Sequence, residues 1–92
     1  MSATVRIPTQ LRPLVGDHDQ VDAIGNTVKE VIADLGSRHP GLAERLLDEG
    51  GQLRRFINVY VNDEDIRFLQ GLDSRVERGA RIAIIPAVAG GT

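Results

Sequence analysis

The stretch Thr27-Val28-Lys29-Glu30-Val31-Ile32-Ala33-Asp34-Leu35 decides the fold, because it has the pattern of a single amphipathic helix. Its apolar residues recur at helical spacing and form one stripe, which consists of Val28, Val31, Ile32 and Leu35. Thr27 and Glu30 have the spacing of a capping box, in which both side chains bind backbone N–H groups at the start of a helix. Pro40 follows, so the helix is predicted to end near Arg38.

Segments with the alternating pattern of β-strands lie on both sides of this helix. Residues 3–8 and 20–24 precede it and are close enough in sequence to pair as a hairpin. Residues 55–62 and 81–86 follow it. Alternation gives the segment 55–62 an inner face with Ile57, Val59 and Val61 and an outer face with Phe56, Asn58 and Tyr60.

The remaining segments are predicted to connect these elements. Residues 11–17 are expected to form a loop, because a proline and a glycine interrupt them. Residues 66–72 are expected to form a short strand or turn with apolar anchors that include Phe68. Residues 73–79 are expected to form a helical turn that Gly79 closes.

The order strand, strand, helix, strand, minor strand, strand indicates an α+β protein in which a mixed sheet wraps one main helix. The first and last strands can lie side by side as a parallel pair in the centre of the sheet. This arrangement is the β-grasp, or ubiquitin-like, fold. We expect one domain at residues 1–89 and a flexible C-terminal diglycine tail at residues 90–92.

The composition argues against several classes of function. The 92 residues include no cysteine, which excludes disulfides and a cysteine nucleophile and fits a cytoplasmic protein. A net charge of -2 speaks against nucleic acid as a partner, and no apolar run is long enough to span a membrane. His18 and His39 lack the spacing of metal ligands, and no serine lies in a nucleophile motif. We therefore expect neither a catalytic residue nor a bound metal.

The C-terminal stretch Ile84-Ile85-Pro86-Ala87-Val88-Ala89-Gly90-Gly91-Thr92 tapers from an apolar strand to residues with small side chains. Gly90 and Gly91 have no Cβ, so the chain there is thin and conformationally free. Such a segment can enter a channel that is too narrow for any side chain. The sequence therefore predicts that this tail is the functional group and that the domain presents it to other proteins.

Two stretches carry a resemblance to a known family: Ile57-Asn58-Val59-Tyr60-Val61-Asn62-Asp63-Glu64-Asp65 and Ile85-Pro86-Ala87-Val88-Ala89-Gly90-Gly91. With the order of the elements, they resemble the ubiquitin-like sulfur carriers of the ThiS/MoaD family, and most closely those that serve cysteine biosynthesis in actinobacteria. The resemblance implies a sulfur carrier and not an enzyme. It implies that an E1-like adenylating enzyme/sulfurtransferase activates Gly91 with ATP and that a sulfur donor converts it to a thiocarboxylate.

The same resemblance implies two further partners, a PLP-dependent cysteine synthase and a zinc metallopeptidase, and no cofactor bound to the carrier itself. Thr92 departs from the family pattern, in which the working form ends at the second glycine. We expect Thr92 to be removed before activation by a metallopeptidase of this type. Three alternatives stay open: a ubiquitin-like modifier conjugated to lysines, an interaction module with an inert tail, and a sulfur donor for molybdopterin, thiamin or a specialised metabolite.

Partner docking is expected on the sheet face that is turned away from the helix. Phe56 and Tyr60 share that face, while Pro86 and Val88 lie at the base of the tail. Exposed aromatic side chains beside a reactive tail suit an enzyme-binding surface, and an ordinary half-covered sheet face is the alternative. The acidic run at residues 63–65 lacks the ligand spacing of a calcium loop and is expected to be a solvated turn.

Overall fold

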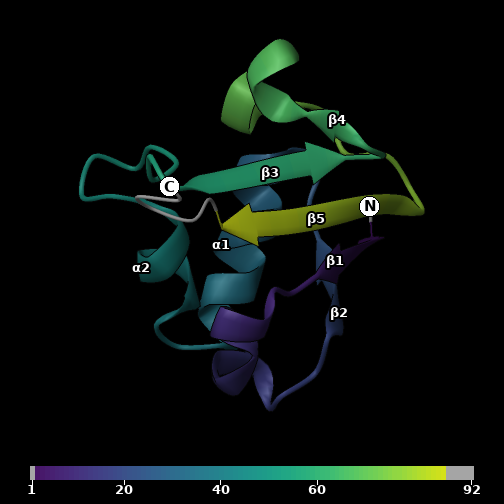
Figure 1. Cartoon of the computed structure of the whole chain (residues 1–92). Helices are drawn as coiled ribbons and strands as arrows, with labels where there is room; N and C mark the ends of the chain where they lie inside the picture. Colours follow the sequence, from purple (N-terminus) through teal and green to yellow (C-terminus); the bar gives the residue numbers. More distant parts are fainter. Residues whose placement is uncertain (1, 87–92) are drawn as a thin grey trace.

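The structure is a computed structural model that describes residues 2–86 of the chain. In this range the helices are α1 (Val28–Arg38), α2 (Leu42–Leu46) and the 3-10 helices η1 (Thr9–Val15), η2 (Ile66–Phe68) and η3 (Gly71–Asp73). The strands are β1 (Ser2–Arg6), β2 (Gln20–Ile24), β3 (Ile57–Val61), β4 (Glu64–Asp65) and β5 (Ala80–Pro86). They form one sheet with the order β2-β1-β5-β3-β4 (Figure 1).

The two strands nearest the ends of the described range lie side by side in this sheet. β1 runs parallel to β5, with Val5 opposite Ile82, and every other pair of neighbours is antiparallel. A parallel pair needs a long crossover connection, and the segment with α1 and α2 is part of the connection here. The predicted β-grasp topology is therefore confirmed, with β5 as the central strand.

The start of α1 is fixed by side chains and by the backbone. The Glu30 N–H donates to the Thr27 hydroxyl at 3.2 Å, as the capping-box spacing predicts. The Glu30 carboxylate accepts from the N–H of Asn26 at 2.8 Å, one residue before the cap. Backbone hydrogen bonds also join this turn to residues 74–76: the Val28 N–H donates to Ser74, and the Val76 N–H donates to Asn26. Hydrogen bonds to residues 74–76, which are distant in the sequence, therefore help to fix the start of α1.

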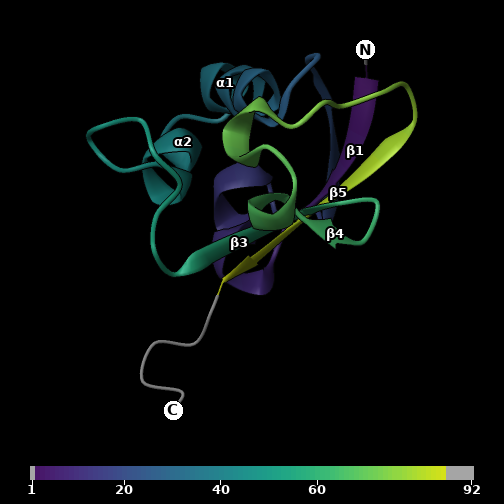
Figure 2. The same cartoon turned by 90° about the horizontal axis from the view of Figure 1, so that it is seen from above.

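The hydrophobic core lies between α1 and one face of the sheet (Figure 2). The whole predicted helical stripe is buried, as are the inward-facing residues of the strands, among them Val5, Val59, Ile82 and Ile84. Burial of each such side chain contributes roughly 1.5–3 kcal/mol relative to its exposure. Leu42 and Leu46 of α2 are fully buried and close one end of this core. On the opposite sheet face, by contrast, the large apolar residue Ile85 is exposed.

Residues 11–15 belong to η1, so the expectation of a loop over residues 11–17 was wrong for most of that range. Leu11 and Val15 are both buried and pack into the hydrophobic core. Pro13 lies inside this 3-10 helix, and Gly16 ends it with a φ of 68°. The proline and the glycine therefore belong to a short helix and its C-cap.

Two expectations for residues 66–79 were also wrong. Phe68 is not an apolar anchor, since 87% of it is exposed while Ile66 is buried. Residues that are two positions apart in a 3-10 helix point in different directions. The short helix η2 can therefore bury the side chain of Ile66 or that of Phe68, but not both. The helical turn lies at Gly71–Asp73, and Arg75 instead forms a bridge with Thr27. Gly79 has a φ of 78° and lies in the turn before β5.

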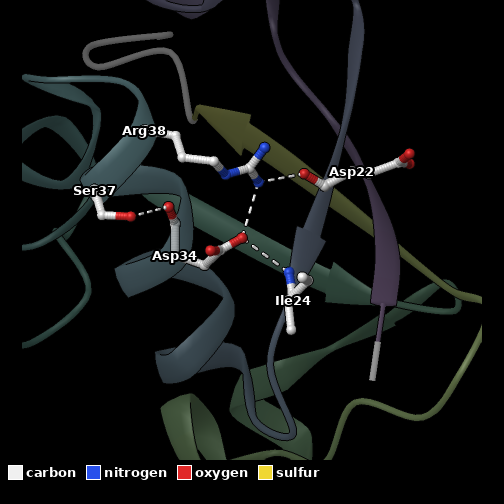
Figure 3. A network of polar contacts seen from close by, with 5 residues as sticks. All are labelled: Asp22, Ile24, Asp34, Ser37 and Arg38. Atoms are coloured by element: carbon white, nitrogen blue, oxygen red, sulfur yellow. Dashed lines mark hydrogen bonds and ion pairs between the residues drawn. The ribbon is translucent and has the colours of Figure 1, made fainter.

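Side chains of α1 cover the outer edge of β2 (Figure 3). The Ile24 N–H donates to the Asp34 carboxylate at 2.9 Å, and the Arg38 guanidinium donates to the same carboxylate at 2.8 Å and to the backbone carbonyl of Asp22. The Ile24 hydrogen bond lowers the pKa of Asp34; burial opposes this effect, and Arg38 adds to it. These hydrogen bonds satisfy the N–H of Ile24 and the carbonyl of Asp22, which the edge strand β2 would otherwise expose to another chain.

Candidate functional site

The end of β5 is fixed beside the beginning of β3. In this antiparallel pair Pro86 lies opposite Ile57, Ile85 opposite Asn58, and Ala83 opposite Tyr60. Pro86 is the last residue that the structure describes, and Gly91 lies five residues further along the chain. A chain of five residues reaches at most about 16–18 Å. Any protein that binds Gly91 must therefore lie close to this end of the sheet.

The outer face at this end of the sheet carries apolar side chains. Phe56 is 52% exposed and Ile85 is 45% exposed, while Tyr60, further along β3, is half-buried. Three residues, Phe56, Tyr60 and Ile85, are called the outer apolar patch below, whereas Pro86 lies opposite the inward-facing Ile57 and therefore belongs to the other face. Apolar side chains on a sheet face without a helix over it are typical of a contact surface. The geometry therefore favours docking of a protein here, beside the origin of the tail.

A polar group borders the outer apolar patch. The Arg67 guanidinium donates to the side-chain oxygen of Asn58, which is the β3 residue opposite Ile85. Arg67 also donates from Nε to the Asp65 carboxylate at 3.4 Å, and the Asp65 carboxylate accepts from the Arg67 N–H at 2.9 Å. These bonds hold the arginine against the edge of the sheet. A cationic and planar group therefore lies next to exposed apolar side chains, a combination that is common at protein interfaces.

A shallow hollow lies further along the same face. Ala83 has Tyr60 opposite it on β3 and Arg6 opposite it on β1. Because alanine is small, it helps to leave a hollow of about 340 Å³, whose sides include Arg6 and Arg81. Asp63 lies 3.9 Å from Arg81, but both side chains are largely exposed, so this ion pair adds little stability. The hollow is lined mainly by polar and charged side chains.

The structure does not gather the four predicted docking residues at one place. Phe56 and Pro86 lie at the end of the β3–β5 pair from which the tail continues, with Pro86 on the inner face; Tyr60 lies opposite Ala83, near the other end, and Val88 lies outside the described residues. Gly90, Gly91 and Thr92 also lie outside them, so the expectations for the tail stay predictions. Ile85 was missed, although alternation with the inward-facing Ile84 could have placed it on the outer face.

The described residues include no group of three or more side chains that could hold a metal ion. No helix within residues 2–86 is long and apolar enough to cross a membrane.

Comparison with known proteins identifies the family. The model of the ThiS family matches residues 5–91. Sulfur carrier protein CysO of Mycobacterium tuberculosis is 50% identical over 93 aligned residues, which cover 99% of this chain and 100% of that protein. A putative sulfur carrier protein of Archaeoglobus fulgidus is 35% identical over 91 residues, with 99% and 100% covered.

A solved structure shows the same fold. The chain superposes with a TM-score of 0.91 and 54% identity on a chain of the Amycolatopsis orientalis BexX/CysO complex, and the match covers 97% of this chain and 99% of that one. The family match includes both glycines of the tail and the whole β3–β5 pair. The chain therefore belongs to the ThiS family and is a homologue of the sulfur carrier protein CysO.

Proposed function

We propose that this protein carries sulfur as a thiocarboxylate on Gly91 and that the sulfur is used to make cysteine. The observation that supports this most is the family match over residues 5–91, which includes Gly90 and Gly91. The 50% identity to a sulfur carrier protein CysO over almost the whole chain favours this branch of the family. Sulfur donation to molybdopterin, thiamin or a specialised metabolite is the alternative.

The chemistry follows from the low reactivity of a carboxylate. A Gly91 carboxylate oxygen attacks the α-phosphorus of ATP, and pyrophosphate leaves. A sulfide equivalent then attacks the carbonyl carbon of this acyl-adenylate, and AMP leaves with the former carboxylate oxygen. An adenylating enzyme supplies the ATP site, the orientation of the groups and the charge stabilisation. The carrier supplies a carboxylate on a thin chain, so it needs no bound cofactor.

The expected partners differ in what they do to Gly91. An E1-like adenylating enzyme/sulfurtransferase forms the thiocarboxylate, and a PLP-dependent cysteine synthase takes the sulfur from it. A zinc metallopeptidase then releases the cysteine product from the carrier. The similar Amycolatopsis chain was solved in a complex with BexX, which supports the idea that this fold assembles with other proteins. We assign the common docking surface to the outer apolar patch.

Thr92 must be removed before the first step. Its presence places the Gly91 carbonyl in a peptide bond, and an amide has no carboxylate oxygen that can attack ATP. We assign this cleavage to a metallopeptidase of the type that releases the product. The proposal therefore requires a processed form that ends at Gly91.

ATP–pyrophosphate exchange with the adenylating enzyme of the same organism tests this proposal. Two proteins are compared, one that ends at Gly91 and one that retains Thr92. We expect exchange with the first protein and none with the second until a metallopeptidase is added. Equal exchange with both proteins would contradict the need for processing. No exchange with either protein would contradict adenylation itself.

A further inference from the structure

A second surface lies beside the outer apolar patch and has a different character. A groove of about 240 Å³ opens between the segment before β3 and the 3-10 helices η2 and η3. Its apolar lining includes Leu53, Ile57 and Leu72, and its charged lining consists of Arg54, Arg55 and Arg67. None of the residues that line it is acidic. Since the whole chain has a net charge of -2, the positive charge here is local.

The three arginines differ in how they are held. The Arg54 Nε donates to the backbone carbonyl of Glu44 at 2.8 Å, and Arg67 is bound by Asp65 and Asn58. Arg55 is exposed and has no hydrogen bond or ion pair with another residue of the described range. Two guanidinium groups are therefore partly fixed, and the third is available to a ligand.

The position of this groove ties it to the tail. Ile57 lines the groove and lies opposite Pro86, from which Gly91 is at most about 16–18 Å away along the chain. The segment before β3 and the end of β5 lie at the same end of the sheet (Figure 1). An enzyme that holds Gly91 in its active site therefore has protein surface within reach of the groove.

The adenylating enzyme has the greatest need for such a contact. Its substrate group is an ordinary glycine carboxylate, which carries no distinguishing chemistry, whereas later partners meet a thiocarboxylate or an aminoacyl group. Selectivity in the first step must therefore come from the body of the carrier. An arginine-lined apolar groove is suited to this, because arginine binds carboxylates with two parallel hydrogen bonds.

We propose that this groove binds an acidic segment of the adenylating enzyme, with an apolar side chain against Ile57 and Leu72 and a carboxylate on Arg55. The inference rests on the proposed function, because it requires an enzyme that activates Gly91. The guanidinium groups supply the charge complementarity, and the apolar lining supplies the area that is removed from water. The groove would thus mark the carrier as the correct substrate.

Charge reversal at Arg55 tests this inference. Binding of the carrier that ends at Gly91 to the adenylating enzyme of the same organism is measured by isothermal titration for the wild type, Arg55→Glu, Arg55→Lys and Arg78→Glu. Arg78 is the matched control, because it is exposed and lies in the turn before β5, at the opposite end of the sheet. Melting curves of the variants establish that each one folds.

We expect Arg55→Glu to weaken binding by about tenfold or more and to reduce its dependence on salt. Arg55→Lys should lose less affinity, because it keeps the charge but not the planar fork, and Arg78→Glu should bind like the wild type. Equal affinities for Arg55→Glu and Arg78→Glu would overturn the proposal. So would binding of ATP or phosphate to the carrier alone that Arg55→Glu abolishes, because the groove would then be a nucleotide site.

Failure of the groove and failure of the carrier function give different results. If the wild type is adenylated and Arg55→Glu binds equally well, only the groove proposal is wrong. If the wild type is bound but never adenylated, the proposed function is wrong whatever Arg55 does.

Discussion

Ile57 and Pro86 lie directly opposite each other in the antiparallel pair of β3 and β5. This pairing places the last described residue of β5 next to both contact surfaces, the outer apolar patch and the arginine-lined groove. The chain that leads to Gly91 therefore continues from this end of the sheet. A protein that binds Gly91 therefore has both surfaces within reach.

Phe56→Ala should weaken binding to the adenylating enzyme by about tenfold, because exposed aromatic residues dominate the energy of many interfaces. The stability should change little, since half of this side chain is already exposed. Ile24→Ala is the control: Ile24 is 66% exposed but lies on β2, at the far edge of the sheet. Isothermal titration and thermal melting separate the two effects. Equal losses of affinity for both variants would contradict docking at the β3–β5 end.

Gly36→Ala should destabilise the protein, although alanine normally stabilises a helix by about 1 kcal/mol relative to glycine. A Cβ at Gly36 would lie 2.7 Å from the Cβ of Ala43, so α1 and α2 could not keep their present separation. We expect a net loss of roughly 1–3 kcal/mol in the free energy of unfolding. Urea unfolding of Gly36→Ala, Ala43→Gly and the double variant measures the coupling. A stabilised Gly36→Ala variant would show that the contact is not restrictive.

Thr27→Ala should lower the free energy of unfolding by about 1 kcal/mol, because the Glu30 N–H loses its acceptor at the start of α1. Thr27→Ser keeps the hydroxyl and should retain most of the stability. Thermal melting of both variants checks this. If the two variants are equally destabilised, the methyl group and not the hydrogen bond is what the protein needs.

Asp34 should make the stability depend on pH in the acidic range. Its pKa in the folded protein is lowered, first by the Ile24 N–H and also by Arg38, while an exposed aspartate titrates near about 3.9. The carboxylate therefore stabilises the fold above that value, and this stability is lost as the pH falls towards the lower pKa of the folded state. The sign follows because protonation is harder in the folded state than in the unfolded one.

The comparison of the wild type with Asp34→Asn measures this effect. The wild type should melt at a higher temperature at pH 7, and the difference should shrink below about pH 4, where the unfolded state binds its proton. Asp22→Asn is the control, because Asp22 meets Arg38 through its backbone carbonyl and not through its carboxylate. A difference for Asp34→Asn that is constant from pH 7 to pH 2 would contradict this role.

The main elements of the fold could be predicted because their residues repeat at the periods of helices and strands. The stripe from Val28 to Leu35 and the alternation of Ile57, Val59 and Val61 both reappear as buried faces. Residues 11–17 and 73–79 could not be predicted in this way. Their conformation depends on distant contacts, such as the bridge between Thr27 and Arg75, which local patterns do not encode.

The candidate site could be predicted only where a single strand carries it. Phe56 and Tyr60 follow from the alternation of β3, and Pro86 from the end of β5. The arginine-lined groove could not be predicted, because Arg55 and Arg67 are twelve positions apart in the sequence. They line the same groove only because η2 packs beside the segment before β3. The register that places Ile57 beside Pro86 is likewise a property of the folded sheet.

Intact-mass spectrometry of the protein that ends at Gly91 tests the central claim most directly. The protein is incubated with ATP, the adenylating enzyme of the same organism and sulfide, and a variant without Gly90 and Gly91 serves as the control. We predict that the mass of the first protein rises by about 16 Da, as sulfur replaces oxygen in the activated acyl group, while the control keeps its mass. An unchanged mass, in a reaction where the enzyme thiocarboxylates a known carrier, would contradict the account.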